Sequence, residues 1–268
     1  MLTDVPRATP LVFVSGAAVG LLGGMIGLGG AEFRLPLLIG LFGFAALSAV
    51  ILNKAMSLVV VLTALPARLA AVPLAELGAH WPVAVNLLAG SLLGAWAGAA
   101  WAVRMRTGTL YRVLAALLVL MAVALLVTHG DFAALTMPAG VRTAAGVAAG
   151  FGIGVVAAIM GVAGGELLIP TIVLLYGVDI KIAGSLSLLV SLPTMLVAFA
   201  RYSRDQSFVV LRENIRFVAV MVVGSVMGAA LGGLLLGVVP DAVLIPALAV
   251  ILLVSAVKLA RHRSVPVR

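Results

Sequence analysis

Four ionisable residues lie inside stretches of the chain that are otherwise apolar: Glu32, Arg34, Lys54 and Glu166. Placing a charged group in a membrane segment costs roughly 2.5–3.5 kcal/mol, so such residues are functional candidates. Arginine and lysine bind anions, and arginine offers an oxyanion a planar, two-pronged contact. We therefore expect Arg34 and Lys54 to bind a small anionic solute, and Glu32 and Glu166 to carry protons or balance charge. The structural alternative is that the glutamates pair with these cations, or that the cations extend to the membrane interface.

A glycine-rich run precedes each glutamate, and a proline follows each of them. Glycine weakens a helix by about 1 kcal/mol relative to alanine, and proline cannot donate a backbone hydrogen bond. The pattern predicts helices that unwind within the membrane and restart, with helix breaks at Pro36 and Pro170. Unwound backbone is tolerated there only inside protein or beside a wet cavity. The unwound residues expected to contribute to anion binding are Gly29, Gly30, Gly164 and Gly165.

Small polar residues occupy the third apolar segment of each half, near 48–71 and 182–200. We expect them to line the same cavity as the cations, and they are Asn53, Ser57, Ser185, Ser187 and Ser191. The alternative is that each serine bonds to the backbone of its own helix, as serines in membrane helices commonly do.

The chain repeats itself at half its length. Glu32 and Glu166 are 134 residues apart, and the same offset places Pro36 on Pro170. It also places Gly90, Ser91, Gly94 and Gly98 on Gly224, Ser225, Gly228 and Gly232. We attribute these glycines to close helix packing. The two cations have no such counterpart, because Leu168 and Leu188 stand at the equivalent positions.

Each half contains five apolar segments. They lie near 10–29, 33–45, 48–71, 82–103 and 110–128, and near 142–162, 165–177, 182–200, 215–237 and 241–259. The second segment of each half is short for a bilayer crossing, so we expect a half-helix or re-entrant piece there. Residues 1–130 and 131–268 are predicted to be two repeats of one integral membrane domain.

Composition places the chain in a membrane. It is 64% hydrophobic and 10% charged, whereas a soluble domain is about half apolar and a quarter charged. The predicted fold class is an all-α polytopic membrane protein. We attribute the net charge of +8 to basic residues that flank the spans, so membrane lipid is an expected partner and nucleic acid is not. Without cysteine or a metal-binding histidine cluster, we expect no metal, no cofactor and no enzyme activity.

Basic residues alternate between the loops. Residues 72–81, after the third segment, contain no lysine or arginine, and the next loop contains Arg104, Arg106 and Arg112. The second half has the reverse order, because the basic loop after its third segment holds Arg201, Arg204, Arg212 and Arg216. Lysine and arginine favour the cytoplasmic side. Equivalent loops should therefore face opposite sides, which predicts inverted-topology repeats with both termini cytoplasmic.

Three motifs resemble the sulfite exporter TauE/SafE family over nearly the whole chain. They are Gly27-Leu-Gly-Gly-Ala-Glu-Phe-Arg-Leu-Pro36, its echo Gly161-Val-Ala-Gly-Gly-Glu-Leu-Leu-Ile-Pro170, and Ala183-Gly-Ser-Leu-Ser187. The stretch Asn53-Lys54-Ala-Met-Ser57 departs from the Gly-Thr/Ser pattern that the family more often has there. The resemblance implies a bacterial inner-membrane permease that exports sulfite, organosulfonates or other small organic anions.

Together these features predict a secondary transporter that exports a small anion by alternating access, with protons as the candidate coupling ion. One alternative is a passive anion channel with the same fold. Another is a membrane subunit or scaffold whose cationic loops dock a partner. A homodimer is compatible with all three.

Overall fold

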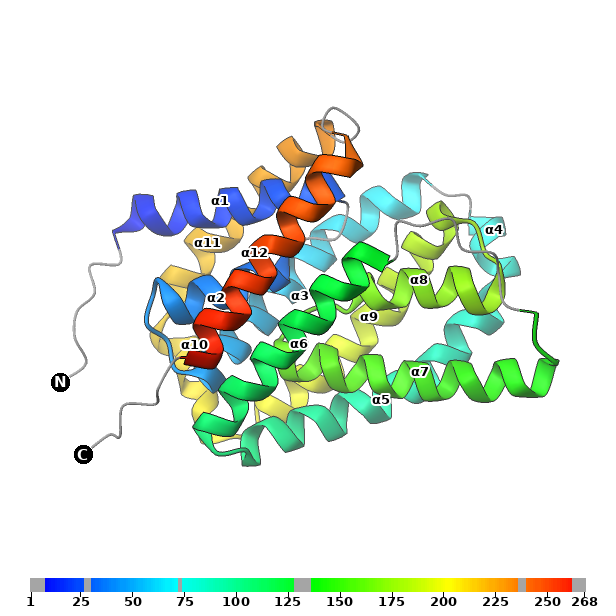
Figure 1. The fold of residues 1–268 in the computed structure, drawn as a ribbon, viewed down its shortest axis with the longest axis horizontal. Helices are drawn as coiled ribbons and strands as arrows, with labels where there is room; N and C mark the ends of the chain where they lie inside the picture. The colour runs from blue at the N-terminus through cyan, green and yellow to red at the C-terminus, as the bar shows by residue number, and fades with distance from the viewer. Residues whose placement is uncertain (1–7, 27–29, 72–73, 128–135, 236–239, 262–268) are drawn as a thin grey trace.

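The protein is an all-helical bundle in the computed structural model (Figure 1). The structure describes residues 8–26, 30–71, 74–127, 136–235 and 240–261. The first half contains α1 (Thr9–Ile26), α2 (Ala31–Gly40), α3 (Ala46–Ala71), α4 (Leu74–Ala79), α5 (Trp81–Arg104) and α6 (Thr107–Val127). The second half contains α7 (Ala139–Met160), α8 (Gly165–Tyr176), α9 (Ile180–Tyr202), η1 (Gln206–Phe208), α10 (Val209–Glu213), α11 (Ile215–Leu234) and α12 (Asp241–Arg261).

All ten apolar segments predicted from the sequence are helices. Among the described residues, seven helices are long and apolar enough to cross a membrane, and these are α3, α5, α6, α7, α9, α11 and α12. The second helix of each half is much shorter, with 10 residues in α2 and 12 in α8. At 1.5 Å per residue, neither can cross about 30 Å of hydrocarbon. The prediction of half-length second segments is therefore confirmed.

The helix boundaries repeat with the sequence. At the offset of 134 residues, α3 and α9 start together, α5 and α11 start together, and α6 and α12 coincide at both ends. The left-handed glycines repeat as well, because Gly30 and Gly43 match Gly164 and Gly177. The two halves therefore share one local structure, element by element.

Helices from different halves form the closest pairs in the bundle. Helix α1 packs along α11, and α5 packs along α7 (Figure 1). Under the repeat, α1 corresponds to α7 and α11 to α5, so each pair is the counterpart of the other. Helices α6 and α12, which correspond to each other, also pack together. This exchange of partners is compatible with two inverted copies of one unit.

Glycines bring the paired backbones into contact. A Cβ atom added to Gly90 or Gly94 of α5 would overlap the carbonyl oxygen of Val147 or Phe151 on α7. On the other pair, Gly228 of α11 faces the carbonyl oxygen of Ala17 in the same way. Only glycine leaves room for such an approach. The structure thus confirms that these repeated glycines serve helix packing.

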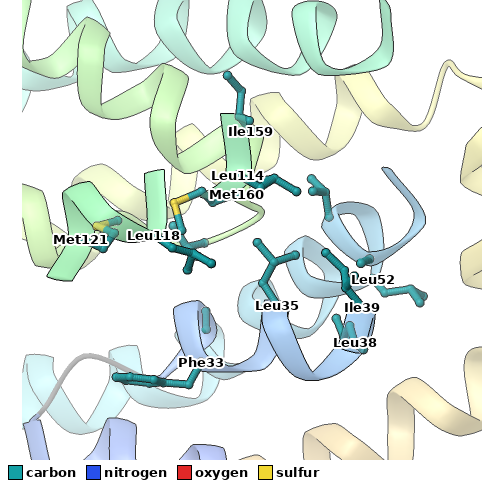
Figure 2. Close-up of a cluster of buried hydrophobic side chains, with 14 of the residues drawn as sticks. Phe33, Leu35, Leu38, Ile39, Leu52, Leu114, Leu118, Met121, Ile159 and Met160 are labelled. Carbon is teal, nitrogen blue, oxygen red and sulfur yellow. The ribbon is translucent and has the colours of Figure 1, made fainter. Parts of the chain in front are cut away.

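The short helix α2 is enclosed by apolar side chains. Figure 2 shows Leu35 of α2 on the side of Met160 and the α6 leucines, and Leu38 and Ile39 near Leu52 of α3, all within one apolar cluster. These side chains are almost completely buried. Burial of this apolar face holds α2 inside the bundle and fixes the position of the polar residues near its first turn.

Candidate substrate-binding site

Each short helix starts directly after a glycine that separates it from the preceding long helix. Helix α1 ends at Ile26 and α2 starts after Gly30, while α7 ends at Met160 and α8 starts after Gly164. Gly30 and Gly164 have φ angles of 69° and 85°, in the left-handed region that favours glycine. Gly29 lies outside the described residues, and Gly165 is the first residue of α8.

The prediction that Pro36 and Pro170 mark the breaks is wrong. Both prolines lie inside the helices that follow the glycines, in α2 and α8. The glycines accommodate the change of chain direction through their backbone angles. Each proline instead lacks the N–H group that would donate to the residue four positions earlier. The carbonyl oxygens of Glu32 and Glu166 therefore have no helical donor.

Arg34 is buried and contacts three neutral oxygen atoms. Its Nη1 donates to Asn53 Oδ1 at 3.5 Å and to Ser57 Oγ at 3.4 Å, and its Nη2 donates to Ser225 Oγ at 3.2 Å. Its Nε has no hydrogen-bond partner. The guanidinium group is therefore held by long bonds to polar groups of both halves and retains an unused donor.

Asn53 connects the helix break before α2 with the helix break after α7. Its Nδ2 donates to the carbonyl oxygen of Ala31 at 3.0 Å and to that of Met160 at 3.2 Å. Ala31 is the first residue of α2, and Met160 is the last residue of α7. One side chain of α3 thus fixes both broken helices and also accepts from Arg34.

Lys54 stabilises the end of α7. Its Nζ donates to the carbonyl oxygens of Ala157 at 2.8 Å and Val162 at 2.6 Å. The last carbonyl groups of a helix lack internal donors and carry partial negative charge, so a cation is favourable there. An ammonium group has three donors, and these contacts use two of them. Lys54 is therefore bound to backbone oxygens in this conformation, and not to a glutamate.

The two glutamates meet across the halves. The carboxyl groups of Glu32 and Glu166 form a side-chain hydrogen bond. A carboxylate can only accept, so a bond between two carboxyl groups requires one proton. Atom Oε2 of each glutamate is buried and has no partner. The bond therefore exists only while at least one of the two carboxyl groups is protonated.

The cluster combines two basic groups with the glutamate pair. Arg34 and Lys54 are both buried, and a proton on the hydrogen-bonded glutamates leaves at most one carboxylate beside them. Glu32 interacts electrostatically with Arg34, which lies two residues further along α2. The basic groups are therefore not matched by an equal number of carboxylates, and a small anion is chemically complementary to this buried cluster.

A family comparison agrees with this geometry. The family described as Sulfite exporter TauE/SafE matches residues 12–259. The chain belongs to this family. With seven candidate spans among the described residues, this TauE/SafE member is a multi-pass membrane protein of a transporter family. Comparisons with curated proteins and with solved structures gave no match.

The serines of this TauE/SafE chain divide into two groups. Ser185 Oγ donates to the Lys181 carbonyl at 3.4 Å, and Ser187 Oγ donates to the Gly184 carbonyl at 2.8 Å, so both bond to their own helix. Ser57 contacts Arg34. Ser191, its counterpart in the repeat, is fully buried and its Oγ has no partner.

Ser225 is the residue that sequence reasoning missed. It contacts Arg34 from α11, although the sequence placed it only in a repeated Gly-Ser-x-x-Gly packing motif. Its counterpart Ser91 lies 2.8 Å from Thr194 Oγ1 on α9. The signal that could have identified both residues is the repetition of serine at one position of a glycine-rich helix.

The cluster is closed in this conformation. Glu32, Arg34, Asn53, Lys54 and Ser57 are all buried, with at most 3% of their surface exposed. The expected cavity open to water at these side chains is therefore not found in this state of the TauE/SafE chain. The side chains instead fill the space between the broken helices with their own hydrogen bonds.

Proposed function

We propose that this chain is a secondary transporter that exports a small oxyanion, such as sulfite or an organosulfonate, by alternating access. The observation that carries the proposal is the buried guanidinium of Arg34, whose hydrogen-bond partners are neutral and whose Nε is unused. A buried cation whose hydrogen-bond partners are all neutral is costly, and a bound anion would offset that cost. The family match, which names a sulfite exporter, supports the same substrate class.

The bonds of Arg34 suit replacement by a substrate. Two of them are 3.4–3.5 Å long, near the upper limit for a hydrogen bond. An oxyanion offers shorter, charge-assisted bonds to the same N–H groups, and a guanidinium can donate two of them in parallel. Anion binding would therefore release Asn53 and Ser57, and Asn53 also holds the ends of α7 and α2.

The broken helices add further donors. The glycines before α2 and α8 provide no side-chain cap, and the first N–H groups of a helix attract anions. In this proposal, the backbone after Gly30 and Gly164 faces the anion together with Arg34. Lys54 contributes its positive charge and its third donor from the end of α7, while Ser191 supplies a free hydroxyl group.

The glutamate pair provides the coupling step. Removal of the shared proton would leave two carboxylates next to each other, and their repulsion would separate α2 from α8. Return of the proton would restore the hydrogen bond and the closed cluster. One proton would then accompany each change between the closed and the separated arrangement.

The experiment is sulfite efflux from proteoliposomes with and without a proton gradient. Glu32→Gln and Glu166→Gln should abolish proton-driven flux, because an amide cannot lose the proton, while the unfolding temperature stays unchanged. The matched control is Glu213→Gln on the exposed helix α10, which should transport normally. Unchanged transport in both glutamate variants would reject the coupling role. Flux that ignores the proton gradient would favour the passive channel.

A thermal-shift screen tests the substrate class separately. Sulfite, sulfate, thiosulfate or small carboxylates should raise the unfolding temperature of the purified protein. Stabilisation by neutral solutes alone would reject the anion. Function that is lost on removal of Arg201, Arg204, Arg212 and Arg216 but retained in Glu32→Gln would favour the scaffold instead.

A further inference from the structure

The closest helix contacts join the two halves and do not lie within them. Gly16, Gly20 and Gly24 of α1 face the backbone of Met221, Ser225 and Ala229 on α11. Because successive glycines meet successive residues in the same order, α1 and α11 run parallel. Gly90, Gly94 and Gly98 of α5 meet Val147, Phe151 and Val155 of α7 in the same parallel manner.

These contacts resist sliding and separation. At most of these glycines, an added Cβ atom would overlap a backbone carbonyl oxygen of the neighbouring helix. Two close-packed backbones cannot shift by part of a turn without steric overlap, because packed interfaces have discrete arrangements. Motion of one half against the other would have to break α1 from α11 and α5 from α7 at the same time.

Buried polar residues of α2 and α9 each contact one of the two helix pairs. Arg34 is held by the first pair through Ser225 of α11. Thr194, one turn after Ser191 on α9, is held by the second pair through Ser91 of α5. Arg34 Nε and Ser191 Oγ are buried atoms without partners, and both belong to residues whose surface is fully buried. Buried polar groups without partners are rare in native proteins, and a bound ligand would provide the missing hydrogen bonds.

We infer that the moving units of this transporter are the α1–α11 pair and the α5–α7 pair, each built from one helix of each half. The anion binds at the seam between the pairs and crosses the membrane when the pairs tilt against each other. The sequence halves are therefore not the moving bodies, although they are the repeated units. This inference rests on the proposed transport function and specifies its mechanics.

The absence of cysteine from the chain allows a direct test with pairs of spin labels on exposed residues. The variant Val14→Cys/Leu231→Cys labels α1 and α11, which belong to one pair but different halves. The variant Leu93→Cys/Val141→Cys does the same for α5 and α7. The variant Val14→Cys/Leu93→Cys labels α1 and α5, which belong to one half but different pairs. All four side chains are at least 55% exposed.

Electron-electron distances are measured on the full chain in lipid nanodiscs, in sodium chloride and in sodium sulfite. Both same-pair variants should give narrow distributions that do not move. The Val14→Cys/Leu93→Cys variant should give a broad or two-peaked distribution that shifts by several ångströms with sulfite. Leu11 and Val85 are exposed alternatives on α1 and α5 if a labelled variant unfolds at a lower temperature than the unmodified protein.

The opposite result overturns the inference. A distance that moves between α1 and α11, with a fixed distance between α1 and α5, means that the halves are the moving bodies. Three narrow distributions that stay fixed in both salts also contradict it. Sulfite efflux by the same labelled proteins tests the proposed function separately. Distances that behave as expected without any sulfite efflux would keep the two moving pairs and reject sulfite as the substrate.

Discussion

The start of α2 and the middle of α3 occupy the same places in the first half as α8 and α9 do in the second, but their chemistry differs. Arg34 and Lys54 of the first half correspond to Leu168 and Leu188 of the second. Leu168 is buried in an apolar cluster with Ile172 and Leu186. The repeated fold therefore accommodates a leucine at a position where the other half carries a buried cation. Because burying a charge is costly, the repeated fold alone does not account for Arg34, whereas Lys54 also stabilises the end of α7.

The largest effect should come from making the first half resemble the second at Arg34. The substitution Arg34→Leu removes the cation that the proposed anion contacts, and loss of a buried charge pair costs about 2–5 kcal/mol. We expect the apparent affinity for sulfite in proteoliposomes to fall by roughly 30-fold or more. The matched control is Leu168→Met, which should leave the affinity within about twofold. Normal affinity in Arg34→Leu would remove Arg34 from the site.

The next effect concerns stability more than binding. In Lys54→Leu, the carbonyl oxygen of Val162 loses its Lys54 donor, while that of Ala157 keeps its bond from the Val162 N–H. An unsatisfied buried group costs about 1–3 kcal/mol. We expect a lower denaturation midpoint, and a smaller loss of sulfite affinity than in Arg34→Leu. The variant Leu188→Met is the control. A Lys54→Leu protein as stable as the unmodified chain would show that α7 does not need this cation.

The packing glycines should behave alike in both halves, unlike the cations. Gly20 of α1 and Gly154 of α7 are repeat counterparts, and each faces a serine carbonyl oxygen, that of Ser225 or Ser91. Overpacking typically costs about 1–3 kcal/mol. We expect Gly20→Ala and Gly154→Ala to lower the unfolding temperature by similar amounts. The exposed Gly152→Ala, with no neighbour at its Cβ position, should not lower it. Unequal losses would mean that the two helix pairs are not equivalent.

The smallest effect separates the two repeated serines. In Ser225→Ala, Arg34 loses one of three partners, so we expect about 1 kcal/mol, or roughly fivefold weaker sulfite affinity. In Ser91→Ala, only the contact with Thr194 is lost, so stability should fall slightly and affinity should not change. Equal changes in affinity would indicate that Ser91 contributes to anion binding as Ser225 does. Both are measured by titrating sulfite against the unfolding temperature and by efflux.

Local features of this fold were predictable from the sequence. Ten apolar segments, two of them short, follow from hydropathy and length, and the interruptions follow from glycine runs before Glu32 and Glu166. The short helix α4, the 3-10 helix η1 and α10 were not predicted. The role assigned to Pro36 and Pro170 was wrong because proline in the second turn removes one donor without ending a helix that its neighbours hold.

Long-range partners were not predictable. Apolar residues surround most of the helices, so periodicity does not indicate that α1 faces α11. Lys54 pairs with backbone carbonyl groups, which every residue possesses, so no side chain in the sequence signals the contact. The contact between Arg34 and Ser225 likewise depends on how α2 meets α11. The binding role of Arg34, Lys54 and the glutamates remains a prediction for the experiments above.

The pairing of α1 with α11 also determines when the protein can finish folding. Arg34 and Ser225, which contact each other, are 191 residues apart, so the ribosome makes the first long before the second. Until α11 enters the bilayer, the glycine face of α1 lacks the helix that it packs against in the finished bundle. Domains that fold as they are synthesised complete their first half early. In this protein, the N-terminal helix α1 can complete its packing only after α11 has been synthesised. Assembly of this transporter is therefore completed late, near the end of translation or after it.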